Sequence, residues 1–266
     1  MCDPGKIAAA LTGADEELRQ AIILDIGRFT VPLFAIRDTG IELAGTGTLF
    51  TSGSSQYILT AAHVWKESLR SATKVGIGIQ ADITNRFSID TRALVPIFPA
   101  HPTPWNRWGP DIAFLRIPSE DVGSINARRP FYSPAVDETV APNVERIEVC
   151  VLMGTPHAFG TFSPAHAGVQ VNGRFIADEI PYSQQGEQDY FDIEIDTSPA
   201  GTPKRWGGVS GGGLWLVHIY CQCMTGKIEW ARSLQGLAFW EDPIGDDCIV
   251  IRCHGPQSIR LAMSSL

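Results

Sequence analysis

The 266-residue sequence has no long apolar run and no cluster of basic residues. A helix that spans a bilayer needs about 20 consecutive apolar residues, so we expect neither a transmembrane segment nor a membrane partner. Lysine and arginine are scattered, and the formal net charge is −8. Because nucleic-acid binding requires clustered positive charge to neutralise phosphates, we also expect no nucleic-acid partner.

The first residues lack the continuous apolar stretch of a secretory signal, since Asp3, Lys6 and Asp25 interrupt them. On this ground the sequence predicts a cytoplasmic location. Cysteines in a reducing cytosol remain thiols, so we expect free thiols at all six cysteines, which are Cys2, Cys150, Cys221, Cys223, Cys248 and Cys253. No second ligand pair stands at a zinc-like spacing from Cys221 and Cys223, and we expect no metal and no cofactor.

Short β-rich segments separated by turn residues cover most of the chain, a pattern typical of all-β barrels and sandwiches. Six candidate strands fall in the first half, at Phe29–Arg37, Leu43–Thr51, Tyr57–Ala61, Lys74–Ile79, Phe87–Ile97 and Asp111–Ile117. Six more fall in the second half, at Ile147–Leu152, Gly168–Ile180, Tyr190–Ile195, Gly213–Tyr220, Leu234–Trp240 and Cys248–Cys253. Two sets of six predict two six-stranded antiparallel β-barrels.

The same pattern divides the chain into four parts. A short helix at Asp15–Ile23 belongs to an N-terminal helical extension, residues 1–27. The first barrel is expected over residues 28–118. A connector rich in Pro, Ser, Asp and Ala covers residues 119–145, and the second barrel with a C-terminal segment covers residues 146–266.

A serine stands alone in the glycine run Gly207–Gly213, directly ahead of the apolar segment Leu214–Val217. Glycine permits positive φ and lets a ligand approach the main chain. Such a turn presents the Ser210 hydroxyl outward while neighbouring N–H groups point at one spot, which acyl transfer requires. Many glycine-rich segments are only loops, so this segment needs support from elsewhere.

Three segments in chain order resemble the signatures of the chymotrypsin/trypsin-like serine peptidases, whose motifs read TAAHC or TAAHV, DIALL and GDSGGP. They are Thr60-Ala61-Ala62-His63-Val64, Asp111-Ile112-Ala113-Phe114-Leu115 and Gly208-Val209-Ser210-Gly211-Gly212. The spacings are 48 residues from His63 to Asp111 and 99 from Asp111 to Ser210, close to those of the family. The resemblance covers roughly Gly45 to Cys253 and implies the double barrel of that family.

By this resemblance His63 is the general base, Asp111 orients its ring, and Ser210 is the nucleophile. The N–H groups of Gly208 and Ser210 would form the oxyanion hole. The implied activity is that of a serine endopeptidase, which hydrolyses protein or peptide substrates through an acyl-enzyme. An intracellular location favours regulatory proteolysis. The other histidines have no comparable context; they are His101, His157, His166, His218 and His254.

The chain departs from the family at two positions near the triad. Val209 stands where zymogen-type members carry an Asp that pairs with a newly cut N-terminus. The chain therefore resembles a non-zymogen type, and control by a regulatory protein partner is left open. Phe239 stands where many members have a Ser that hydrogen-bonds the triad Asp, so Asp111 is expected to lose one partner.

Four residues are candidates for substrate binding by the same resemblance: Lys204, Phe239, Trp240 and Glu241. Lys204 lies six residues before Ser210, at the base of the primary specificity pocket, where a cation would favour an acidic substrate side chain. Glu241, at the pocket rim, would favour a basic one. The two could also pair with each other, so cleavage specificity stays open.

Two other functions remain as alternatives. A protease-fold binding module without activity is one, because Val209 and Phe239 could leave the site poorly organised. The motif around Ser210 also fits Gly-x-Ser-x-Gly, the nucleophile elbow of α/β-hydrolases, with Asp247 and His254 as formal partners. An α/β-hydrolase-type esterase is disfavoured, because only 56 residues follow Ser210 and the upstream strands lack the alternating helices of a parallel sheet.

Overall fold

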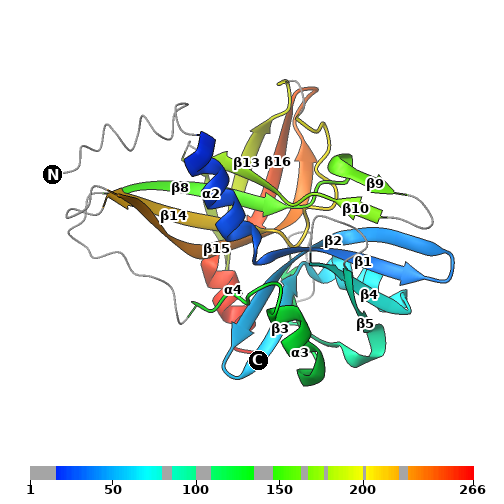
Figure 1. Cartoon of the computed structure of the whole chain (residues 1–266). Coiled ribbons are helices and arrows are strands. Elements are labelled where there is room, and N and C mark those ends of the chain that lie inside the picture. Colours follow the sequence, from blue (N-terminus) through cyan, green and yellow to red (C-terminus); the bar gives the residue numbers. More distant parts are fainter. Residues whose placement is uncertain are drawn as a thin grey trace.

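The structure is a computed structural model, and the residues it describes are 16–79, 86–99, 109–134, 146–162, 167–176, 179–199, 202–221 and 227–266. Residues 1–15 of the predicted N-terminal extension and residues 135–145 of the predicted connector lie outside them. Two seven-stranded sheets make up most of the described chain (Figure 1). The prediction of an all-β, two-barrel fold is confirmed, with seven strands in each sheet where six were predicted.

The first sheet has the strand order β5-β4-β1-β2-β3-β7-β6. Its strands are β1 (Thr30–Arg37), β2 (Gly40–Ser52), β3 (Ser55–Thr60), β4 (Lys74–Gly78), β5 (Arg86–Asp90), β6 (Val95–Ile97) and β7 (Ala113–Arg116). The outermost strands, β5 and β6, are consecutive in sequence and are joined by the 3-10 turn Thr91–Ala93. The one strand predicted at Phe87–Ile97 is therefore broken in two. The first half, β5, pairs with β4, and the second half, β6, pairs with β7. This brings the two ends of the sheet together.

The second sheet has the order β11-β8-β14-β15-β16-β13-β12. Its strands are β8 (Arg146–Gly154), β11 (Asn172–Ile176), β12 (Tyr182–Gln185), β13 (Gln188–Asp196), β14 (Gly213–Cys221), β15 (Ile228–Pro243) and β16 (Cys248–His254). A separate hairpin consists of β9 (Gly160–Phe162) and β10 (Ala167–Val169). The outermost strands, β11 and β12, are again neighbours in the sequence. The strand β12 was not predicted, because all four of its residues are exposed and it shows no apolar alternation.

Every pairing between the strands of the two large sheets is antiparallel. An α/β-hydrolase requires a mostly parallel sheet covered by helices. The esterase alternative is therefore wrong.

Three α-helices accompany the sheets in the described residues: α2 (Glu16–Gly27), α3 (Ser119–Asn126) and α4 (Pro256–Met263). The helix α2 corresponds to the one predicted before the first barrel, and it packs across β8 and β11 of the second sheet (Figure 1). The helix α3 lies inside the predicted connector, and α4 was not predicted. No helix in the described part of the chain is both long and apolar enough to cross a membrane.

An aromatic cluster joins the two sheets. Trp215, on β14, is fully buried and stacks on Phe29, which directly precedes β1, at a ring-centroid distance of 5.7 Å. Tyr132 meets Trp215 edge-on at 4.8 Å and Phe29 at 5.8 Å. Phe50, on β2, belongs to the same buried cluster. The two halves of the chain therefore share one apolar core.

The cysteine prediction is wrong at one position. Cys150, Cys248 and Cys253 are free thiols, but Cys221 is disulfide-bonded. Disulfides are rare in cytosolic proteins. The bond at Cys221 therefore counts against the reducing cytosol that was the reason for expecting free thiols. The predictions for Cys2 and Cys223 fall outside the described residues.

Candidate active site

His63 and Asp111 meet because they flank two paired strands. His63 lies just after β3 and Asp111 just before β7, and these antiparallel strands pair through Thr60 and Ala113. The Asp111 carboxylate accepts two hydrogen bonds from His63. Oδ1 accepts the main-chain N–H at 2.8 Å, and Oδ2 lies 2.5 Å from Nδ1 of the ring.

This contact shifts the pKa of His63. Burial lowers the pKa of the imidazole, but the hydrogen bond to Asp111 and the negative charges of Asp111 and Glu67 raise it more, so that the net pKa lies above the ordinary 6.5. A carboxylate can only accept, so Nδ1 donates to Asp111 and the lone pair of the neutral ring is on Nε2. The side chain remains 31% exposed, which leaves the ring accessible for proton transfer.

The glycine loop of Ser210 packs against the first sheet. A Cβ on Gly211, whose φ is +90°, would lie 2.0 Å from the Thr46 carbonyl oxygen and 2.2 Å from Thr60 Oγ1. Gly208 has φ +95° and a similarly crowded environment. These two positions therefore require glycine both for conformation and for space.

Two buried threonines anchor this loop. Thr46 Oγ1 donates to the Gly208 carbonyl at 2.7 Å and accepts the Thr155 N–H at 3.0 Å. Thr155 Oγ1 also lies 3.2 Å from the Gly208 carbonyl oxygen. Both threonines are fully buried, so the hydroxyl groups hold the loop main chain in one position.

The carbonyl groups that precede the two predicted oxyanion donors are both bound. The Gly207 carbonyl accepts the His157 N–H at 2.8 Å, and the Val209 carbonyl accepts the Gly212 N–H at 2.7 Å. The N–H and C=O of a trans peptide point in opposite directions, so the N–H groups of Gly208 and Ser210 face away from these partners. Neither N–H donates a hydrogen bond within the described residues.

Ser210 lies beside the segment that carries His63. Its carbonyl oxygen accepts the Thr46 N–H at 2.9 Å. A Cβ on Gly45 would lie 2.8 Å from Val64 Cγ2 and 2.9 Å from the Ser210 carbonyl oxygen. Gly45 therefore lies between the segment after His63 and the loop of Ser210, with no room for a side chain. Across the described residues no hydrogen bond joins Ser210 Oγ to the His63 ring.

Three of the four predicted substrate-binding residues line a pocket next to Ser210. Its volume is about 30 Å³, and it is lined by Trp206, Gly207, Val209, Ser210, Ala238, Phe239, Trp240, Glu241 and Ile251. The Trp240 side chain is 39% exposed. The Phe239 side chain is buried and stacks on His254, so it belongs to the core as well as to the pocket wall.

Lys204 does not belong to this pocket. Its side chain is 60% exposed and forms an ion pair with Asp247 at 2.5 Å. Glu241 is fixed differently, because its Oε2 accepts the Trp206 N–H at 3.0 Å and its Oε1 lies 3.9 Å from the Arg205 guanidinium. Lys204 and Glu241 therefore do not pair with each other.

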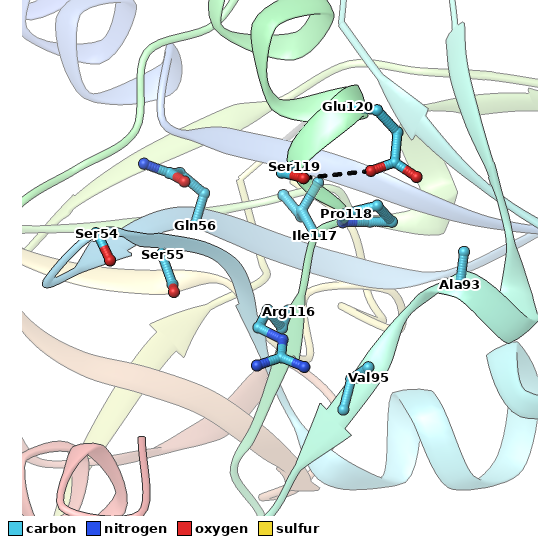
Figure 2. Close-up of a pocket in the computed structure, with 10 residues that line it drawn as sticks. All are labelled: Ser54, Ser55, Gln56, Ala93, Val95, Arg116, Ile117, Pro118, Ser119 and Glu120. Atoms are coloured by element: carbon cyan, nitrogen blue, oxygen red, sulfur yellow. Dashed lines mark hydrogen bonds between the residues drawn. The ribbon is translucent and has the colours of Figure 1, made fainter.

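A separate pocket of about 360 Å³ lies at the opposite ends of β3 and β7 from His63 and Asp111 (Figure 2). Its lining residues are Ser54, Ser55, Gln56, Ala93, Val95, Arg116, Ile117, Pro118, Ser119 and Glu120. A hydrogen bond from Ser119 to Glu120 crosses part of it. It contains none of the candidate site residues.

Two kinds of residue at this site were missed from the sequence. The threonine anchors Thr46 and Thr155 carry no local motif. His254 was set aside with the other histidines, yet its Nε2 accepts the Asp111 main-chain N–H at 3.0 Å. The residues of this bond are 143 positions apart in the chain, and no spacing rule relates them.

Solved structures of serine proteases resemble this fold. The thermostable serine protease AL20 from an extremophilic microorganism is 13% identical over 90% of this chain and 97% of its own, with a TM-score of 0.50. Protease Anisep from Arthrobacter nicotinovorans is 13% identical over 84% of this chain and 89% of its own, with a TM-score of 0.42. No protein-family model and no curated protein sequence matches the chain. The chain has a chymotrypsin-like two-barrel fold, and an identity this low shows the fold alone.

Proposed function

We propose that the protein is a serine endopeptidase of the trypsin-like type, with Ser210 as nucleophile, His63 as general base and Asp111 as the residue that orients His63. The observation that carries the proposal is the hydrogen bond of 2.5 Å between Asp111 and Nδ1 of His63, beside a loop with two unbonded N–H groups. The proposed substrates are peptides or proteins, and the proposed reaction needs no cofactor.

In the proposed reaction, Ser210 Oγ attacks the substrate carbonyl carbon while His63 Nε2 takes the hydroxyl proton. The negative charge on the carbonyl oxygen would be stabilised by the N–H groups of Gly208 and Ser210. Collapse of the tetrahedral intermediate breaks the peptide C–N bond, and His63 returns the proton to the leaving amine. Water then hydrolyses the acyl-enzyme by the same steps. The hydrogen bond between a nucleophile and its general base is often long in the free enzyme and tightens only when substrate binds.

The test is the intact mass of the full chain after treatment with a fluorophosphonate, which reacts with an activated serine. We expect one adduct on the wild type and none on Ser210→Ala or His63→Ala. Ser119→Ala, which removes a hydroxyl group in the separate pocket, is the matched control and should keep the adduct. An adduct that persists on Ser210→Ala would contradict the proposal.

An inactive binding module remains the second candidate. It is favoured by the lack of a hydrogen bond between Ser210 Oγ and the His63 ring in the described part of the chain. A well-folded wild type that takes no adduct and cleaves no denatured protein substrate would support it. A cytoplasmic location, against which the disulfide at Cys221 counts, is a separate proposal that cell fractionation can test.

A further inference from the structure

A buried histidine contacts the main chain of Asp111. His254, the last residue of β16, has no solvent exposure. Its Nε2 accepts the main-chain N–H of Asp111 at 3.0 Å. Because Nε2 accepts, it carries the lone pair of the ring, and the proton of the neutral imidazole is on Nδ1.

Three neighbours fix the orientation of this ring. Phe239 stacks on it with a centroid distance of 4.1 Å and an interplanar angle of 20°. Tyr190 lies against it at 5.4 Å. Gly109 approaches so closely that a Cβ there would lie 2.8 Å from Cε1 of the ring. The lone pair on Nε2 therefore has little freedom to turn away from Asp111.

Burial keeps His254 able to accept a hydrogen bond. Burial lowers the pKa of His254 to about 4, against a smaller opposing effect of the carboxylates of Asp111 and Asp189. The Asp189 carboxylate is already bound by α4, where it accepts the N–H groups of Gln257 and Ser258. At neutral pH the His254 ring is thus uncharged, and Nε2 is an acceptor.

These contacts hold Asp111 at every polar group that it has. Its N–H is bound by His254, its carbonyl accepts the Ala62 N–H at 3.2 Å, and both carboxylate oxygens accept from His63. The hydroxyl partner that the family resemblance led us to expect is replaced by Phe239, which instead packs against His254.

We propose that His254 is a positioning residue of the active site: by accepting the Asp111 N–H, it fixes the main chain of Asp111 so that the carboxylate stays aimed at His63. This role depends on the proposed function for its effect on catalysis. Its effect on the His63–Asp111 pair, however, can be measured without catalysis.

The experiment compares the full chain carrying His254→Leu with that carrying His254→Gln. Leucine fills the space but removes the acceptor, which leaves the buried Asp111 N–H without a partner. Glutamine supplies a carbonyl oxygen at a similar reach. Two quantities are measured for each: the rate constant of fluorophosphonate labelling, and the titration midpoint of His63 by NMR.

For His254→Leu we expect a labelling rate about tenfold or more below wild type, because the lost hydrogen bond acts through Asp111 on the general base. The His63 midpoint should move to lower pH, because Asp111 no longer holds the proton on Nδ1 as well. His254→Gln should restore most of the labelling rate and reverse most of the shift in the His63 midpoint. A purely structural role would lower the melting temperature of both variants and leave the His63 midpoint unchanged.

The outcomes separate the two proposals. If the wild type takes no label, the proposed function fails, while a lower His63 midpoint in His254→Leu still supports the positioning role. If His254→Leu is folded and matches the wild type in both quantities, the positioning role is overturned. If His254→Leu does not fold, Phe239→Leu takes its place. A smaller shift of the His63 midpoint in the same direction would then support the role, and an unchanged midpoint would overturn it.

Discussion

At the scale of single residues, His63 links electrostatics to reactivity. In the proposed reaction its ring must be neutral to take the Ser210 proton. Burial lowers the pKa of His63, but Asp111 and Glu67 raise it more, so that it lies above 6.5. Fluorophosphonate labelling should therefore fall as the pH drops through a midpoint higher than that of an unperturbed histidine. Rate constants of labelling measured from pH 5 to 9 check this, and a midpoint below 6.5 would contradict it.

The variants Asp111→Asn and Glu67→Gln separate the effects of the two carboxylates on His63. Asparagine keeps the shape of the side chain but removes the charge and favours the wrong tautomer of His63. We expect the labelling rate to fall by about four orders of magnitude, the loss in kcat that this change causes where a Ser-His-Asp triad is established. The midpoint should shift to lower pH. Glu67→Gln, which removes only a more distant charge, should lower the midpoint slightly and leave the maximal rate close to that of the wild type.

At the scale of elements, the loop that carries Ser210 depends on glycine at Gly211. Gly211→Ala would place a methyl group 2.0 Å from the Thr46 carbonyl oxygen, in addition to the unfavourable positive φ. Gly186 also has positive φ, yet a Cβ there meets nothing within 4 Å. Gly186→Ala should therefore cost about 1–2 kcal/mol for conformation alone, whereas Gly211→Ala should cost more than about 4 kcal/mol.

Urea unfolding of both variants checks this difference, and labelling checks its consequence. Gly186→Ala should react like the wild type, and Gly211→Ala should not react even where it is folded. Equal losses of stability in the two variants would show that the contact with β2 and β3 is unimportant for the loop.

The elements also show what the sequence could predict. Alternating apolar residues located most of the strands, and the helix α2 follows from its acidic first turn. The strand β12 could not be predicted, because a fully exposed strand is held by main-chain bonds to β13 rather than by buried side chains. The break at Thr91–Ala93 was also missed, since apolar residues continue on both sides of it.

For the candidate site, the motifs of His63, Asp111 and Ser210 were visible because each is a local pattern. The contact between His254 and Asp111 was not, since it forms only where the end of β16, in the second sheet, meets the segment before β7 in the first sheet. Lys204 was expected near the pocket base from its offset to Ser210. Loop geometry turns it outward instead, to Asp247.

At the scale of the whole molecule, the site depends on how the two sheets are joined. His63 and Asp111 belong to the first sheet and Ser210 to the loop before β14. Their alignment therefore requires that the sheets keep one relative position. The aromatic cluster around Trp215 supplies the shared core, with Phe29 and Tyr132 packed on its two sides.

Trp215→Ala should therefore weaken both halves of the molecule together. Removing a fully buried tryptophan costs about 3–5 kcal/mol, and the cavity would lie where the sheets meet. Trp240→Ala, at a position that is 39% exposed, should cost less than about 1 kcal/mol.

Hydrogen exchange followed by mass spectrometry would report amides of β1–β7 and of β8–β16 separately. Coincident loss of protection in both groups on Trp215→Ala is expected, since the shared core makes them one cooperative unit. Loss confined to the second sheet would mean that the sheets are stable independently, and that the position of Ser210 relative to His63 is held by the Thr46 contacts alone.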